Sequence, residues 1–166
     1  MSYRNKTYVC FDGDEDIRYY RMMTAWKAND NLPFDFHDAH DLNTARDSSQ
    51  EESIKRQLRV RFENSKTFIV LIGQKTKSLR KFVKWEMEVA VKLGLPIIGV
   101  NLDGSRGQTA LCPAAIFNTL SVYIPFNLKI IQHAMNHWPS EHATKSKAGE
   151  SGAFYYKDSV FQQLGI

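Results

Sequence analysis

Short apolar runs and longer amphipathic segments alternate along this chain. Runs rich in β-branched and aromatic residues predict strands at residues 7–11, 33–36, 67–73, 95–102 and 121–125. The run T-F-I-V-L-I-G at 67–73 is apolar almost throughout, which is typical of a strand buried on both faces of a parallel sheet. We therefore expect Val70 in the core and the central strand at this place.

Helices are predicted between the strands, where apolar residues recur every three or four positions. In the segment 17–28, Tyr19, Met22, Met23 and Trp26 share one face, so we also expect Trp26 in the core. A second helix begins at a capping box of Ser48 and Glu51 and has Ile54, Leu58 and Phe62 on one face. A third helix covers 81–93 and is ended by Gly94. Two more helices are predicted at 128–138 and at 155–164, the latter after a flexible stretch at 142–152.

This alternation predicts an α/β fold of three layers, with helices on both faces of a central parallel sheet of about five strands. A chain of 166 residues suits one domain over residues 1–166. In such a sheet, ligands bind at the carboxyl ends of the strands. Candidate site residues are therefore sought in the loops that follow the strands.

Composition narrows the class of protein. The longest apolar runs fall well short of the ~20 residues that cross a bilayer, and residues 1–7 are polar, so we expect a cytoplasmic protein with no membrane partner. The two cysteines, Cys10 and Cys112, are too few for a disulfide scaffold and fit a reducing compartment. Neither cysteine has the surroundings of a nucleophile.

The net charge of +4 is unevenly spread. Residues 54–92 carry eleven Lys and Arg against three Asp and Glu, but aromatic residues are not interleaved with them, which argues against nucleic acid as a partner. Between positions 75 and 84 lie five cations, Lys75, Lys77, Arg80, Lys81 and Lys84. They either attract a pyrophosphate or form a solvated face, and both interpretations stay open.

Two acidic loops follow the first two strands. Asp12, Asp14 and Asp16 have alternate spacing, but the loop lacks the Gly and Glu of a calcium-binding hand, so favourable placement at a helix N-terminus is the better explanation. The run H-D-A-H-D at 37–41 is interpreted as a polar loop, with Asp38 kept as a candidate cleft residue. We predict no metal site. Phosphate-loop and dinucleotide fingerprints are absent from the sequence.

Glu86, in the sequence K-W-E of the helix at 81–93, is the most interesting acidic residue. It lies three residues after Val83 and four before Ala90, which places it at the border of the buried face. A carboxylate at that border can reach a cleft.

These motifs together resemble the bacterial TIR-like domains, especially those of the Thoeris anti-phage defence system. The resemblance covers Tyr8 to about Leu102, a recognisable core of 7–102 with a C-terminal extension at 103–166. It rests on the ordered motifs V-C-F-D-G-D-E-D, Tyr20, A-W at 25–26, F-D-F at 34–36, I-K at 54–55, I-V-L-I-G, V-K-W-E at 83–86 and G-L-P-I-I-G-V. The fold that it implies is flavodoxin-like, in agreement with the pattern of elements.

The resemblance also implies a function. Active members cleave the nicotinamide glycosidic bond of NAD, and some convert the ADP-ribose into a signalling nucleotide for a downstream effector. Their catalytic glutamate falls on Glu86, and the residues expected to bind substrate are Phe11, Asp12, Gly13, Asp38, Lys77, Arg80 and Trp85. NAD is then a substrate, and no further cofactor is expected. The alternative is an inactive TIR module that self-associates through TIR surfaces.

Overall fold

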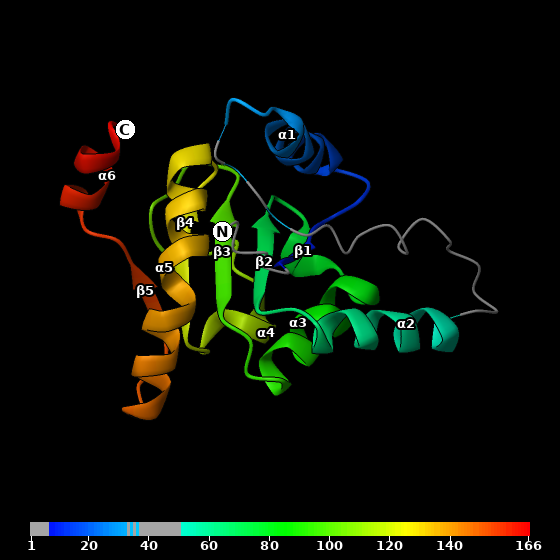
Figure 1. Ribbon diagram of the computed structural model, residues 1–166. Helices are drawn as coiled ribbons and strands as arrows, with labels where there is room; N and C mark the ends of the chain where they lie inside the picture. Colours follow the sequence, from blue (N-terminus) through cyan, green and yellow to red (C-terminus); the bar gives the residue numbers. More distant parts are fainter. Residues whose placement is uncertain (1–6, 33, 35, 37–50) are drawn as a thin grey trace.

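The computed structural model describes residues 7–32, 34, 36 and 51–166 (Figure 1). In these residues a sheet of five parallel strands has the order β1, β2, β3, β4, β5. The strands are β1 (Thr7–Cys10), β2 (Thr67–Ile72), β3 (Ile97–Asn101), β4 (Ser121–Pro125) and β5 (Ala153–Tyr155). Because all neighbours pair in parallel, every strand has its carboxyl end at the same edge of the sheet. The predicted α/β fold is confirmed.

Helices cover both faces of the sheet and complete three layers (Figure 1). One face packs against α1 (Ile17–Ala28), α5 (Leu128–Lys147) and α6 (Asp158–Leu164). The other face packs against α2 (Glu51–Glu63), α3 (Phe82–Lys92) and the short α4 (Ala114–Phe117). A single 3-10 turn, η3 (Thr76–Ser78), follows β2.

The two faces of β2 explain its apolar sequence. Ile69 and Leu71 point into the layer of α1 and α5, whereas Phe68, Val70 and Ile72 point into the layer of α2 and α3. All six residues of β2 are buried. Burying one such aliphatic side chain contributes about 1.5 to 3 kcal/mol, so this strand anchors both halves of the core.

The expected core residues differ in depth. Val70 is fully buried, as predicted. Trp26 is only half-buried and packs at the edge of the core, against the rings of Phe34 and Phe126. Met22 is exposed, because the buried residues of α1 are Tyr20 and Met23, on a neighbouring face of the helix.

The prediction of a strand at 33–36 is not supported by the described residues. Phe34 and Phe36 are buried but lie in no strand, and Pro33 and Asp35 lie outside the described residues, as does Ser48 of the predicted capping box. The fifth strand is β5, whose last residue, Tyr155, is also the first residue of the predicted terminal helix. Of its three residues only Phe154 is partly buried, since β5 lies at the edge of the sheet beside β4. So short and exposed a strand leaves little apolar pattern.

The helix predicted at 128–138 continues to Lys147, so the expectation of a flexible stretch at 142–152 is wrong for its first six residues. Pro139 lies within α5 and lacks an N–H, yet the helix continues beyond it. The turns after Pro139 are mostly exposed, and this removes the apolar periodicity on which the prediction relied.

The end of α3 agrees with the sequence. Gly94 has a φ of 69°, in the left-handed region that favours glycine, and the N–H of Leu95 donates to the carbonyl of Ala90 at 3.1 Å. These contacts stop the helix and direct the chain into β3. They also fix the direction of α3, which carries the candidate carboxylate Glu86.

Candidate functional site

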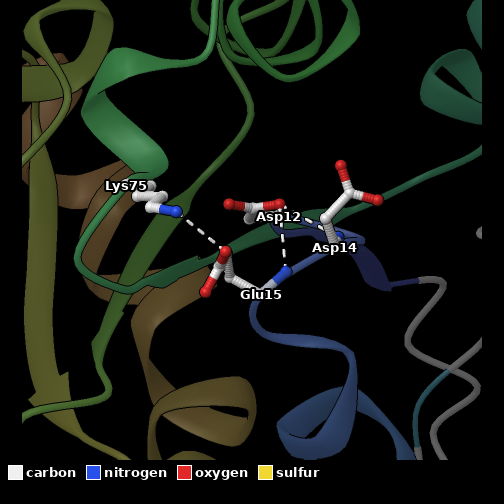
Figure 2. A network of polar contacts seen from close by, with 4 residues as sticks. All are labelled: Asp12, Asp14, Glu15 and Lys75. Carbon is white, nitrogen blue, oxygen red and sulfur yellow. Dashed lines mark hydrogen bonds and ion pairs between the residues drawn. The ribbon is translucent and has the colours of Figure 1, made fainter.

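The loops after β1 and β2 meet at the carboxyl edge of the sheet. Lys75, after β2, forms an ion pair with Glu15, after β1, with 2.9 Å between Nζ and Oε1 (Figure 2). The hydrogen bond and the positive charge of Lys75 lower the pKa of Glu15. Both side chains are more than half exposed, so the pair links the loops without adding much to stability.

Asp12 shapes the loop that follows β1. Its Oδ1 accepts hydrogen bonds from the backbone N–H groups of Asp14 (3.0 Å) and Glu15 (3.3 Å), and the side chain is buried (Figure 2). Gly13, between Asp12 and Asp14 in the sequence, is half-buried. The Asp14 carboxylate points away from Lys75 (Figure 2). Asp12 therefore uses one carboxylate oxygen to hold the turn itself.

Phe11 lies where β1 runs into this loop. Its ring is buried and stacks on Tyr20 of α1, with 4.6 Å between ring centroids and 16° between ring planes. Phe11 therefore anchors the start of the loop to the core. Its expected contact with a nucleotide stays a prediction.

Asp16, which the sequence placed at a helix N-terminus, is a buried carboxylate. It precedes α1, and its Oδ2 has no hydrogen-bond partner. A Cβ atom at Gly73, directly after β2, would lie only 2.7 Å from Asp16 Cγ, so the absence of a side chain at Gly73 makes room for the carboxylate. Burial raises the pKa of Asp16, and the negative charges of Asp12 and Glu15 raise it further.

The raised pKa of Asp16 predicts a pH-dependent effect of Asp16→Asn. The folded protein holds this proton more tightly than the unfolded chain, so stability is highest below the unfolded pKa and is lost as the pH rises through the folded pKa. Asn cannot titrate, so the free energy of unfolding of Asp16→Asn should rise relative to wild type from about pH 4 to about pH 7. Urea unfolding across this range measures it. A difference independent of pH contradicts the prediction.

Glu86 lies deeper than the sequence indicated. Only 1% of the residue is exposed, so it does not stay at the border of the buried face of α3. It lies near Cys10 at the end of β1, whose thiol donates to the carbonyl of Val83, one turn before Glu86 on α3, at 3.9 Å. Burial raises the pKa of that thiol well above its ordinary value, and the negative charge of Glu86 raises it further.

Trp85 points in another direction, because successive residues of a helix are separated by about 100°. Its half-buried ring lies against α2, 6.0 Å from the ring of Phe62. The cations of Lys55 and Arg59 lie 5.6 Å and 5.8 Å from the ring centroid. The Trp85 ring therefore packs toward α2, and its expected contact with substrate stays a prediction.

The predicted basic residues lie beyond β2. Lys77 belongs to η3 and donates a hydrogen bond from Nζ to the carbonyl of Ala110, at 3.1 Å, in the loop that follows β3. Arg80 and Lys81 are exposed just before α3. These residues share the carboxyl edge with Asp12, whereas Asp38 lies outside the described residues.

Residues 7–32, 34, 36 and 51–166 contain no group of three or more His, Cys, Asp or Glu side chains that could hold a metal ion. The same residues contain a surface pocket lined by Arg106, Gly107 and residues 155–158, near the carboxyl ends of β3 and β5. That pocket includes none of the described residues predicted for the site.

A comparison with known protein families decides the family. The model described as Thoeris protein ThsB, TIR-like domain, matches residues 8–107, which is more than half of the chain. The chain belongs to this ThsB TIR-like family. The resemblance predicted from the sequence is confirmed, and the protein is a component of anti-phage defence.

The region matched to the ThsB TIR-like domain runs from β1 to the loop after β3. It includes all of the residues predicted for the site, namely Phe11, Asp12, Gly13, Asp38, Lys77, Arg80, Trp85 and Glu86. Helix α5 and strands β4 and β5 lie outside it. Across the described part of this ThsB domain, no helix is both long and apolar enough to cross a membrane.

Proposed function

We propose that this ThsB TIR-like domain cleaves the nicotinamide glycosidic bond of NAD in the cytoplasm and produces an ADP-ribose-derived signalling nucleotide. One observation carries the proposal: within the family match, α3 holds the Glu86 carboxylate against the end of β1, at the carboxyl edge of a parallel sheet. This edge is where α/β sheets bind their ligands.

The chemistry needs a carboxylate. When the bond between nicotinamide and the ribose C1′ breaks, its electron pair leaves with nicotinamide and positive charge develops on the ribose ring. A fixed negative charge stabilises this oxocarbenium-like ribose, and it does so more strongly in a water-poor site. Glu86 supplies the charge and can accept hydrogen bonds from the ribose hydroxyls. Water, or a nucleophile of the ADP-ribose itself, then attacks C1′.

The burial of Glu86 implies a closed resting state. A residue that is 1% exposed cannot touch a ribose, so substrate reaches Glu86 only after neighbouring segments move. Such a closed carboxylate suits an enzyme that acts after a trigger, and the two states would differ in population on infection. The nucleotide product would then act on a downstream effector.

The other residues are proposed to bind substrate. Asp12 and Gly13 shape the loop after β1, and Phe11 fixes its position. Lys77 and Arg80 provide positive charge for the pyrophosphate at the same edge, and Asp38 is proposed to complete the cleft. Trp85, whose ring packs against α2, is proposed to adjoin this cleft.

Neutralising the basic residues is expected to weaken substrate binding. The triple variant Lys77→Gln, Arg80→Gln, Lys81→Gln should raise KM for NAD more than it lowers kcat, because a pyrophosphate contact holds ground state and transition state alike. The effect should shrink at high salt, where exposed charges are screened within about 10 Å or less. Steady-state kinetics at two salt concentrations measures both.

A matched control removes the same charge at the opposite edge. Lys66, Lys92 and Lys147 are exposed and lie close to the amino ends of strands β2, β3 and β5. Their triple substitution with Gln should leave KM unchanged. Equal effects of the two triples would assign the change in KM to net charge and remove the proposed pyrophosphate contact.

Incubating the purified protein with NAD tests the function directly. The reaction is run with and without components of an infecting phage, and its products are identified by mass spectrometry. We expect release of nicotinamide together with an ADP-ribose-derived nucleotide. Intact NAD under both conditions contradicts the proposal.

The burial of Glu86 also favours a second candidate function, a module without activity that associates with other TIR surfaces. Analytical ultracentrifugation distinguishes the two. Self-association together with intact NAD supports the interaction module, whereas NAD turnover excludes it.

A further inference from the structure

The pocket near the carboxyl ends of β3 and β5 has the size and the place of a ligand site. Its volume is about 460 Å³, within the range of roughly 300 to 1,000 Å³ that is typical of small-molecule sites. Its lining comes from two segments, the loop after β3 with Arg106 and Gly107, and residues 155–158 at the end of β5 and the start of α6. Both segments follow parallel strands at the edge where such sheets bind ligands.

The pocket is separate from the residues proposed for NAD cleavage. In the described sheet, β1, whose end lies near Glu86, and β5 are at opposite edges (Figure 1). Neighbouring strands lie about 4.8 Å apart, so four spacings place β5 roughly 19 Å from β1. None of the described residues assigned to NAD cleavage lines the pocket. A ligand in this pocket is therefore a matter beyond the proposed function and does not depend on it.

Arg106 is held in place by contacts of its backbone and of its side chain. The Asn101 side chain, buried at the end of β3, donates from Nδ2 to the carbonyl oxygens of Ser105 (2.9 Å) and Gly107 (2.8 Å). These bonds fix the backbone directly before and after Arg106. Its guanidinium carbon lies 3.9 Å from the centroid of the buried Phe161 ring. A cation fixed in this way loses little conformational freedom when it binds an anion.

The charges of the lining favour an anion with several oxygens. Arg106 Nη1 lies 3.4 Å from Oδ1 of Asp158, a long contact to a side chain that is 87% exposed, and such a pair contributes little to stability. A guanidinium has five N–H donors in a planar fork that matches a phosphate group. Lys157 is exposed and adds a second cation to the lining, against the one carboxylate of Asp158.

An exposed aromatic ring lies beside these cations. Tyr155, the last residue of β5, lines the same pocket and is 70% exposed, so its ring is available to a flat group. Stacking of a base on an aromatic side chain is a common source of affinity for nucleotides. A phosphate and a flat ring are the two parts of a nucleotide, and this pocket offers a contact for each.

We propose that the pocket binds a nucleotide, with its phosphate groups on Arg106 and Lys157 and its base against Tyr155. The ligand joins two parts of the chain, because Arg106 lies within the family match at residues 8–107 and Tyr155 lies beyond it. Binding should therefore raise the melting temperature of the protein.

Calorimetric titration of the purified full chain with ADP tests the proposal. Adenosine, which has the base without the charge, and inorganic phosphate, which has the charge without the base, are titrated beside it. We expect ADP to bind at least about tenfold more tightly than either of them. Phosphate that binds as tightly as ADP, or no binding of ADP at millimolar concentration, overturns the proposal.

Substitutions in the lining separate the two contacts. Arg106→Gln removes the charged donors and should raise the Kd for ADP at least about tenfold. Tyr155→Ala should raise Kd about fivefold or more, whereas Tyr155→Phe keeps the ring and should keep the wild-type Kd. Lys157→Gln removes a cation whose side chain is exposed, so it tests the charge even if Arg106→Gln disturbs α6. Arg21→Gln, which removes an exposed guanidinium from α1, is the control for net charge and should leave Kd unchanged.

Nuclear magnetic resonance of the full chain tests the place of binding. The backbone amide signals of Gly107 and Lys157 should shift as ADP is added, because both residues line the pocket. Unmoved signals at both residues overturn the proposal.

A last comparison keeps this pocket apart from the proposed NAD site. The triple variant Lys77→Gln, Arg80→Gln, Lys81→Gln should bind ADP like the wild type. Loss of ADP binding in the triple variant, with wild-type binding in Arg106→Gln, would place the nucleotide at the NAD site and overturn the proposal. Intact NAD in the wild type refutes the proposed function alone, since the titration with ADP requires no turnover.

Discussion

Glu86→Gln is expected to lower the kcat for NAD cleavage by at least about a hundredfold while the domain stays folded. The amide keeps the shape of the side chain and removes the negative charge that the oxocarbenium-like ribose requires. Nicotinamide release measures kcat, and circular dichroism with thermal unfolding checks the fold. This substitution tests the catalytic carboxylate most directly.

Glu88→Gln is the matched control. Glu88 lies two residues further along α3, is about half exposed and pairs with Lys84 at 3.7 Å. The control variant loses the same charge from the same helix, so it should keep the wild-type kcat. Wild-type turnover in a folded Glu86→Gln protein, or an equal loss in Glu88→Gln, would remove Glu86 from the catalytic role.

Trp138→Ala is expected to have the largest effect on stability. Trp138 is 1% exposed, and its ring, on α5, lies 6.0 Å from that of Phe154 in β5. Truncating a buried Trp typically costs about 3 to 5 kcal/mol, a large part of the roughly 5 to 15 kcal/mol that holds a domain together. Urea unfolding measures the loss.

Trp26→Ala is the variant with which the loss of unfolding free energy in Trp138→Ala is compared. Trp26 is half-buried, so the same truncation exposes less new apolar surface and should cost clearly less than Trp138→Ala. A Trp138→Ala protein that unfolds at the wild-type urea concentration would contradict the burial of α5 against β5. An equal loss in both variants would contradict the difference in depth between the two rings.

The helices and strands predicted correctly are those whose own residues show a clear pattern of apolar positions or a residue that ends the element. Strand β2 is apolar from Phe68 to Ile72 because both of its faces are covered, and α3 has its periodicity and Gly94 within thirteen residues. Strand β5 has three residues and one partly buried side chain, so its place depends on pairing with β4. No local pattern could reveal that pairing.

In the candidate site as well, the sequence predicts some features, whereas others depend on how distant segments pack. Glu86 could be found from its motif and its position on α3, but its depth depends on how β1 packs against that helix. The contact of Cys10 with Val83, one turn before Glu86, joins residues 73 positions apart, and Trp85 turns toward α2 for reasons of packing. Gly73, which ends the I-V-L-I-G run, was the one local hint that a side chain such as Asp16 lies close to the backbone.

The boundary of the family match has a consequence for synthesis of the protein. Residues 8–107 supply three of the five strands in the described sheet, and β3 pairs along its whole length with β4, which lies beyond them. A fragment that ends at residue 107 leaves the N–H and C=O groups of an apolar strand edge open to other chains, which favours aggregation. On the ribosome, the same edge stays uncovered until β4 has emerged, so this interval is when the growing chain most needs a chaperone.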